Sequence, residues 1–95
     1  MEKLDRKKLN TLERVFKGVA SRRRIAILEI IDKNSDYNLD EIAKSLKTNY
    51  QTTAEHVRRL RIAGLINDGY KGKSKSYDLS PFGKKILKIV RTFLD

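Results

Sequence analysis

The feature that most constrains the fold is a stretch over residues 39–64, which carries two short helical patterns separated by a break. Asn38 is a favourable N-cap for the first helix, and Glu41 three residues later completes the spacing of a capping box. The break covers residues 47–49 and ends on Asn49, a favourable N-cap for a second helix. Two short helices joined by such a turn indicate a helix-turn-helix motif.

The second helix has two chemically different faces. One face carries Thr53, Val57 and Leu60 at helical spacing, with His56 beside them. The opposite face is polar and net basic, with Gln51, Thr52, Glu55, Arg58 and Arg59. A helix that lies in a DNA major groove needs such a face. An ordinary helical hairpin with a solvated face has the same pattern, so this stretch alone leaves both interpretations open.

After Gly64 the hydrophobic period changes from helical to alternating. Residues 65–79 predict two short strands around a Gly- and Lys-rich tip, and the first strand is expected to lose regularity at Asp68-Gly69. Three lysines and no acid occupy that tip: Lys71, Lys73 and Lys75. A hairpin directly after a recognition helix is typical of a wing, whose lysines contact backbone phosphate or enter the minor groove. As an isolated feature, a Lys-rich hairpin tip more often serves to keep a protein soluble.

Amphipathic helices are predicted at both ends of the chain. The first covers residues 1–19, and the last covers residues 81–94 and starts at Ser80-Pro81, an N-cap followed by a favourable first helical residue. Both apolar stripes are wider than one side of a small domain covers, since Leu87 and Leu94 widen the second. We therefore expect a dimer interface of seven apolar side chains: Leu9, Leu12, Phe16, Ile86, Ile89, Val90 and Phe93. The alternative is that the two helices cover each other within one chain.

A further helix is expected over residues 22–32, with Ser21 as its cap. Its many aliphatic residues indicate packing on more than one side, near the centre of the core. It opens on Arg22-Arg23-Arg24, three cations that oppose the helix dipole. A phosphate contact by Arg22 is one explanation and a solvated charge run is the other. Residues 34–36 predict a turn, and Tyr37 a short edge-strand contact.

The chain has 95 residues, of which 22 are Lys or Arg and 12 are Asp or Glu, so its net charge is +10. This excess is spread along the chain and favours a polyanionic partner. The absence of cysteine excludes disulfides and thiolate-bound metals. No apolar run approaches a membrane span, and the amino terminus mixes acids with bases. We expect one domain over residues 1–95, in a cytoplasmic protein with no membrane partner.

These motifs resemble the ArsR-like winged helix-turn-helix transcription regulators. The similar segments are residues 20–28, 39–46, 49–60, 63–66 and 77–81. The most specific parts are the Ala-Gly-Leu-Ile turn and the Leu-Ser-Pro that closes the wing. The resemblance implies homodimers that bind palindromic operator DNA, with the terminal helices as the interface. Metal-sensing members use cysteines in the helix before the hairpin, or His and acidic clusters on the last helix. This chain has neither, so no metal or other cofactor is expected.

The predicted fold class is mostly α with a small β-hairpin wing. The predicted function is sequence-specific double-stranded DNA binding by a homodimeric transcription regulator. Base readout is expected from Tyr50, Gln51, Thr52 and Glu55. Backbone contacts are expected from Arg22, Asn49, Arg58, Arg59, Lys71, Lys73 and Lys75. The role of Glu55 stays open, because an acid repels phosphate yet can accept a hydrogen bond from cytosine N4.

Two alternatives use the same scaffold: a sequence-tolerant architectural DNA-binding protein and a winged helix that contacts proteins. An enzyme is not expected. The chain has no cysteine nucleophile and a single histidine, His56, on a helix whose neighbours suit packing or groove contact. It also has no glycine-rich phosphate loop, since Gly69 and Gly72 belong to the hairpin.

Overall fold

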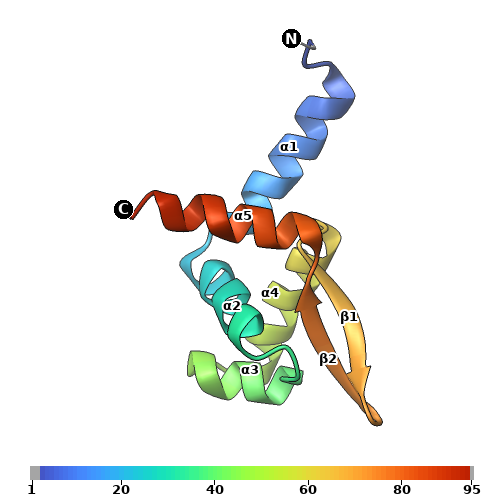
Figure 1. The fold of residues 1–95 in the computed structure, drawn as a ribbon, viewed down its shortest axis with the longest axis vertical. Helices are drawn as coiled ribbons and strands as arrows, with labels where there is room; N and C mark the ends of the chain where they lie inside the picture. Colours follow the sequence, from blue (N-terminus) through green and yellow to red (C-terminus); the bar gives the residue numbers. More distant parts are fainter. Residues whose placement is uncertain (1–2, 95) are drawn as a thin grey trace.

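The computed structural model describes residues 3–94, which form five helices and a two-stranded hairpin (Figure 1). In chain order the elements are α1 (Arg6–Val19), α2 (Arg22–Lys33), α3 (Leu39–Leu46), α4 (Tyr50–Ile62), β1 (Ile66–Lys71), β2 (Ser74–Leu79) and α5 (Pro81–Thr92). Residues 1 and 2 of the predicted first helix, and the last residue of the predicted domain 1–95, lie outside the described residues. The predicted fold class, mostly α with a hairpin wing, is confirmed.

Helix starts follow the predicted caps. The side chains of Ser21, Asn38, Asn49 and Ser80 each accept a hydrogen bond from a backbone N–H in the first turn of the helix that follows. Asn38 forms the complete capping box with Glu41. The first helix starts later than predicted, because the carboxylate of Asp5 accepts from the backbone N–H of Lys8 and caps α1 at Arg6.

Helix α2 lies at the centre of the core, as its aliphatic content predicted. Ile27, Leu28 and Ile31 are fully buried, and α2 contacts α1, α3, α4, α5 and β2. Leu87 of α5 also belongs to this core. The sequence pattern counted Leu87 among the residues that widen the apolar stripe of the last helix, but it is 2% exposed and packs within the core of the chain, so it does not widen the exposed stripe.

The wing is an antiparallel pair whose register runs from Ile66 opposite Leu79 to Lys71 opposite Ser74. The strand does not break at Asp68-Gly69, as the sequence suggested, because both residues pair in register with β2. The tip is also shorter than predicted and consists of Gly72 and Lys73. Gly72, the first of these two residues, has a φ of 64°, whereas Lys73 does not have a positive φ. This is the pattern of a type II′ turn.

The predicted strand contact at Tyr37 is not formed. The sheet of the described residues holds only β1 and β2, and the chain passes from the turn at residues 35 and 36 directly into the cap of α3. Tyr37 instead packs, half-buried, against the core.

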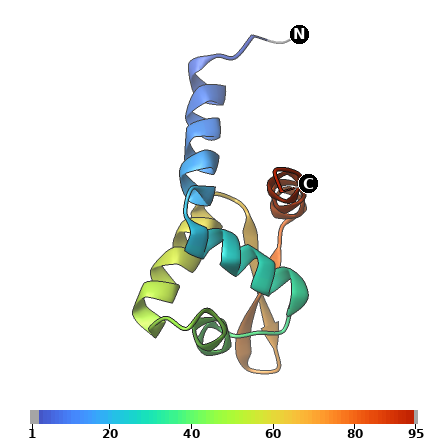
Figure 2. The same ribbon diagram turned by 90° about the vertical axis from the view of Figure 1, so that its left-hand side faces the viewer.

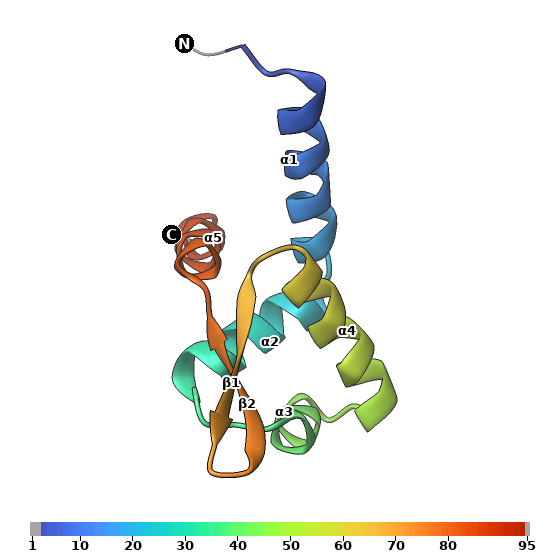
Figure 3. The ribbon, with the colours of Figure 1, turned by 90° about the vertical axis from the view of Figure 1, so that its right-hand side faces the viewer.

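The helices divide the molecule into two ends (Figures 2 and 3). Helix α1 projects away from the body, and α5 crosses near the end of α1 that joins the body. At the opposite end lie α3, the start of α4 and the tip of the wing. Helices α1 and α5 do not cover each other, since Phe16 is 65% and Phe93 81% exposed. The alternative of intrachain cover is therefore wrong.

Candidate nucleic-acid interface

Helix α4 is anchored to the body by one face. Thr53 and Leu60 are fully buried and Val57 is nearly so. The hydroxyl of Thr53 donates to the carbonyl of Asn49 over 2.9 Å, which satisfies its polar group inside the core. At the helix start, the Asn49 side chain accepts from the backbone N–H of Thr52 over 2.7 Å. Both the position and the orientation of the helix are therefore determined by its inner face and its cap.

The outer face of α4 is open to solvent. Gln51, Glu55, Arg58 and Arg59 are exposed, Thr52 is half-buried, and Tyr50 at the first turn is 55% exposed. These side chains occupy the face on which the sequence pattern placed them. Their contacts with bases and phosphates stay predictions.

Glu55 forms ion pairs with two arginines on the same face. Its carboxylate accepts from Arg58 Nε over 3.0 Å and Nη2 over 2.8 Å, and from Arg59 Nε over 3.1 Å. The hydrogen bonds from Arg58, with the positive charges of both arginines, lower the pKa of Glu55 to about 2. Glu55 is thus ionised at neutral pH and partly neutralises the two predicted phosphate-binding groups. The spacings i,i+3 and i,i+4 allow such pairs and could have indicated them.

Arg24 has a role that sequence reasoning missed. Its guanidinium donates to the carbonyls of Gly18 over 2.6 Å and Lys17 over 3.1 Å, at the end of α1. Its Nη1 lies 3.3 Å from Nδ1 of His56 on α4. Because arginine only donates, Nδ1 accepts and the imidazole is neutral. Burial, followed by the charge of Arg24, lowers the pKa of His56. Arg22, the predicted phosphate contact, is exposed at the start of α2.

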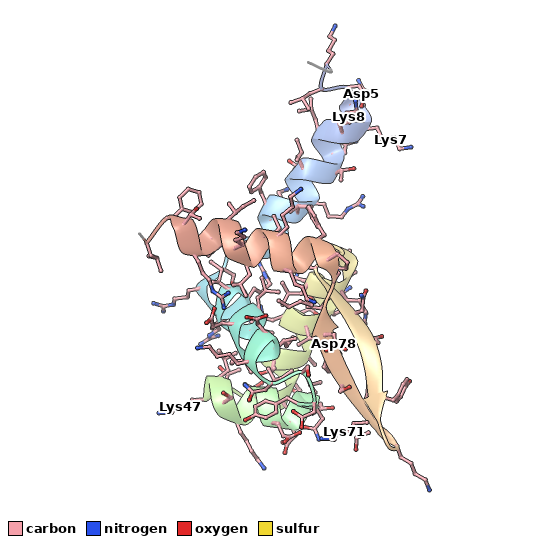
Figure 4. The ribbon with its side chains drawn as sticks, viewed as in Figure 1. Asp5, Lys7, Lys8, Lys47, Lys71 and Asp78 are labelled. Carbon is pink, nitrogen blue, oxygen red and sulfur yellow. The ribbon has the colours of Figure 1, made fainter. Side chains whose placement is uncertain are left out.

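The three wing lysines differ in their surroundings. The side chain of Lys71 is labelled in Figure 4. Its Nζ lies 2.8 Å from Asp36 in the loop after α2, and Lys75 Nζ lies 3.2 Å from Asp68. Lys75 also stands 5.9 Å from the ring centroid of Tyr77. Lys73 occupies the turn and forms no ion pair within residues 3–94. The tip itself has no acid, as its sequence indicated, but the fold brings two acids to its flanks.

An apolar groove lies between α1 and α5, at the other end of the molecule. It has a volume of about 640 Å³ and is lined by apolar residues only: Phe16, Val19, Ala20, Ile25, Ile86, Ile89, Val90, Phe93 and Leu94. Five of the seven predicted dimer residues are exposed, at 38% to 81%: Leu9, Leu12 and Phe16 on α1, and Ile89 and Phe93 on α5. The other two, Ile86 and Val90, are half-buried. The structure thus leaves both stripes uncovered.

The described part of the chain, residues 3–94, has no group of three or more His, Asp or Glu arranged to hold a metal ion. Within the same residues, no helix combines the length and apolar character needed to cross a membrane.

A helix-turn-helix with an exposed polar second helix, followed by a β-hairpin, defines a winged helix-turn-helix. Residues 21–67 match the family model for winged helix-turn-helix DNA-binding. The family match covers α2, α3, α4 and the start of β1. The chain therefore has a winged helix-turn-helix fold.

Solved structures share this fold. The homodimeric winged helix-turn-helix DNA-binding domain of a possible ArsR-family regulator from Mycobacterium bovis has a TM-score of 0.83 and 23% identity, covering 100% of this chain and 90% of that one. Reduced HlyU from Vibrio cholerae has a TM-score of 0.77 and 23% identity, covering 92% of each chain. An ArsR-like transcriptional regulator from Rhodococcus has a TM-score of 0.74 and 24% identity, covering 90% of this chain and 78% of that one. No curated protein matches the sequence. The fold that the resemblance to ArsR-like regulators implied is confirmed.

Proposed function

We propose that this protein is a sequence-specific regulator of transcription that binds palindromic operator DNA as a homodimer. The observation that carries the proposal is the geometry of α4. Its inner face is locked into the core through Thr53, Val57 and Leu60, while its outer face presents hydrogen-bonding and cationic groups to solvent. A recognition helix in a major groove needs both properties at once.

The side chains on the outer face of α4 differ in which part of the DNA they can reach. Tyr50, Gln51 and Thr52 stand on the first turn, the part of a recognition helix that meets base edges. The amide of Gln51 offers both a donor and an acceptor, the combination that reads adenine. Glu55 would accept from cytosine N4 only after it releases its two arginines.

The backbone contacts would come from groups around this helix. Asn49 uses its side-chain oxygen for the helix cap, so its amide nitrogen would be the donor to a phosphate. Arg58 and Arg59 follow on α4, and Arg22 lies at the start of α2. Lys73 reaches furthest along the wing, with Lys71 and Lys75 behind it.

The homodimer would form through the α1–α5 groove. A second copy supplies an apolar surface of the same kind, and burying exposed apolar side chains stabilises association in proportion to their area. Phe93, Phe16 and Ile89 are the largest exposed contributors, at 81%, 65% and 45% exposure. A twofold pair would place two α4 helices on half-sites about one helical turn apart or a small multiple of it. The related domain from M. bovis is homodimeric.

In vitro selection of bound DNA from a random pool tests the whole proposal. We expect a palindromic motif, which would establish specificity and twofold symmetry together. Affinity for that motif should fall by about 10³ to 10⁵ between 50 and 200 mM salt if the dimer makes roughly six to ten phosphate contacts. A selected pool without a motif would contradict the sequence-specific function.

A sequence-tolerant architectural protein is the second candidate, and the net charge of +10 favours it. It predicts affinities within about tenfold for all sequences. The Gln51→Ala variant separates the two candidates. A regulator loses discrimination at one base pair, by about 1–3 kcal/mol, whereas an architectural protein with the same substitution binds as before.

A further inference from the structure

A second groove lies between α1 and α4, on the side of α4 that carries the predicted DNA contacts. It has a volume of about 320 Å³. We call it the α1–α4 groove, and its lining residues are Arg14, Lys17, Gly18, Arg58, Arg59 and Ile62. Four of these six residues are cations. Arg14 and Lys17 come from α1, which the sequence analysis assigned only to dimer formation.

The close approach of the two helices produces this groove. A Cβ added to Gly18 would lie 2.8 Å from the Cβ of Ala63, closer than two carbon atoms can pack, so α1 crosses α4 at this glycine. Arg14 lies one helical turn before Gly18 and therefore on the same face of α1. The crossing thus brings Arg14 beside the arginines of α4.

The electrostatics of the groove favour an anion. The carbonyls of Lys17 and Gly18, at the negative end of the α1 dipole, are occupied by the guanidinium of Arg24. Two acids oppose the four cations: Glu13 lies 3.7 Å from Lys17, and Glu55 is shared by Arg58 and Arg59. All these pairs are largely exposed, and exposed ion pairs are weak. A phosphate can replace the carboxylates at little cost.

The groove continues the predicted readout face of α4. Gln51, Glu55, Arg58 and Ile62 follow one another at intervals of three and four residues, which places them on a single face. From Gln51 to Ile62 the helix rises by about 16 Å. The DNA major groove is about 12 Å wide, so a helix that enters it with the first turn brings its second half beside the phosphates at the groove edge.

Dimer formation through α1 leaves these cations accessible. Leu9, Leu12 and Phe16 occupy one side of α1 at helical spacing, and Arg14 lies on the opposite side. A partner that covers the apolar stripe therefore does not cover Arg14.

We propose that the α1–α4 groove binds phosphates of the DNA backbone, and that Arg14 and Lys17 extend the interface beyond the helix-turn-helix and the wing. This inference rests on the proposed function as a double-stranded DNA-binding protein. It assigns to α1 a role in DNA contact besides its role in the dimer.

The test compares three proteins by fluorescence anisotropy on one duplex, with salt varied from 50 to 200 mM. These are the wild type, the R14Q/K17Q variant and the control K84Q/K88Q, which removes the same charge from the outer side of α5. Loss of two phosphate contacts per protomer lowers the slope of log affinity against log salt by about 1.8, or about 3.6 for a dimer. Over this salt range the wild type should then lose on the order of 100-fold more affinity than R14Q/K17Q.

The control should keep the wild-type slope, and all three proteins should have the same oligomeric state and melting temperature. An unchanged slope in R14Q/K17Q, on a duplex that the wild type binds, overturns the groove as a DNA contact and leaves the proposed function intact. An equal loss of slope in K84Q/K88Q also overturns it, since the effect would then reflect net charge alone. If the wild type binds no duplex in this range, the proposed function fails and the groove inference with it.

Discussion

The two ends of this molecule share one core but present opposite surfaces. At the helix-turn-helix end, the outer face of α4 is polar, and its acid and bases satisfy one another while no DNA is bound. At the α1–α5 end, the exposed groove is lined by apolar side chains, including Phe16 and Phe93. A charged surface is stable in water without a partner, whereas a large apolar surface is not. The difference supports the proposal that one end binds DNA reversibly and the other binds a second copy of the chain.

The largest effect is expected from making the apolar end polar. The I89Q/F93Q variant should shift the protein from dimer to monomer, because both side chains are exposed and neither belongs to the core of the monomer. Affinity for a palindromic duplex should fall by about 10² to 10⁴, since the second half-site then binds independently. Light scattering measures the oligomeric state, and fluorescence anisotropy measures the affinity for the duplex. A dimer that persists in I89Q/F93Q would contradict the claim that the apolar end forms the dimer interface. K84Q/K88Q is the matched control on the same helix.

The next largest effect is expected at the contact that holds α5 against the backbone before the wing. Gly83 of α5 packs against the backbone of Leu65, just before the wing: an added Cβ would clash with the Leu65 carbonyl oxygen and lie 2.9 Å from its carbon. We expect Gly83→Ala to lower the free energy of unfolding by about 3 kcal/mol or more, because backbone cannot move aside as a side chain can. Urea denaturation measures this.

Gly69→Ala is the control for that change, since its Cβ would meet two side-chain oxygens at ordinary contact distances, the Ser76 hydroxyl at 3.4 Å and the Asp78 carboxylate at 3.8 Å. Equal stability of the Gly83→Ala variant and the wild type would show that α5 is not held at this contact.

A smaller effect is expected at the polar end. Glu55→Gln should raise affinity for unrelated DNA by on the order of tenfold, since it removes one negative charge and frees Arg58 and Arg59 for phosphates. Because the pKa of Glu55 is about 2, its charge is present throughout the usual pH range. Filter binding on a random duplex measures the change. Asp32→Asn removes one negative charge beside Arg91 on another face, where Arg91 keeps its bonds to Glu29, and should have less effect. A lower affinity of Glu55→Gln would contradict this role.

The smallest expected effect is a pH dependence of stability at His56. Its pKa is lowered in the fold from the ordinary value of 6.5, chiefly by burial, so the unfolded chain takes up the proton first as the pH falls. Stability is therefore unaffected by His56 above pH 6.5 and decreases as the pH falls through the lower folded pKa. Melting temperatures at pH 7.5 and 5.5 should differ more for the wild type than for His56→Gln, which cannot titrate. Equal differences would show that Arg24 does not require a neutral partner.

Much of the fold could be predicted from the sequence because its signals are local. Each cap residue accepts a hydrogen bond from a backbone N–H within three residues. The helices capped by Asn38, Asn49 and Ser80 accordingly begin where the sequence indicated. The buried face of α4 follows from a helical period over a few turns. The prediction was wrong where the local sequence pattern disagreed with strand pairing. Asp68-Gly69 resembles a strand break, but both residues pair with β2 in the antiparallel ladder.

The sequence by itself determined the helix-turn-helix, the wing and the two faces of α4, since these depend on neighbours in the chain. Only the tertiary structure decided which distant groups the charged residues contact. Arg24 reaches the end of α1 and His56, and Lys71 reaches Asp36, a residue 35 positions away. It also decided that α1 and α5 leave a groove open, and that Gly18 brings Arg14 beside α4. Such contacts depend on how helices cross, and helix crossing is set by the whole core rather than by any one segment.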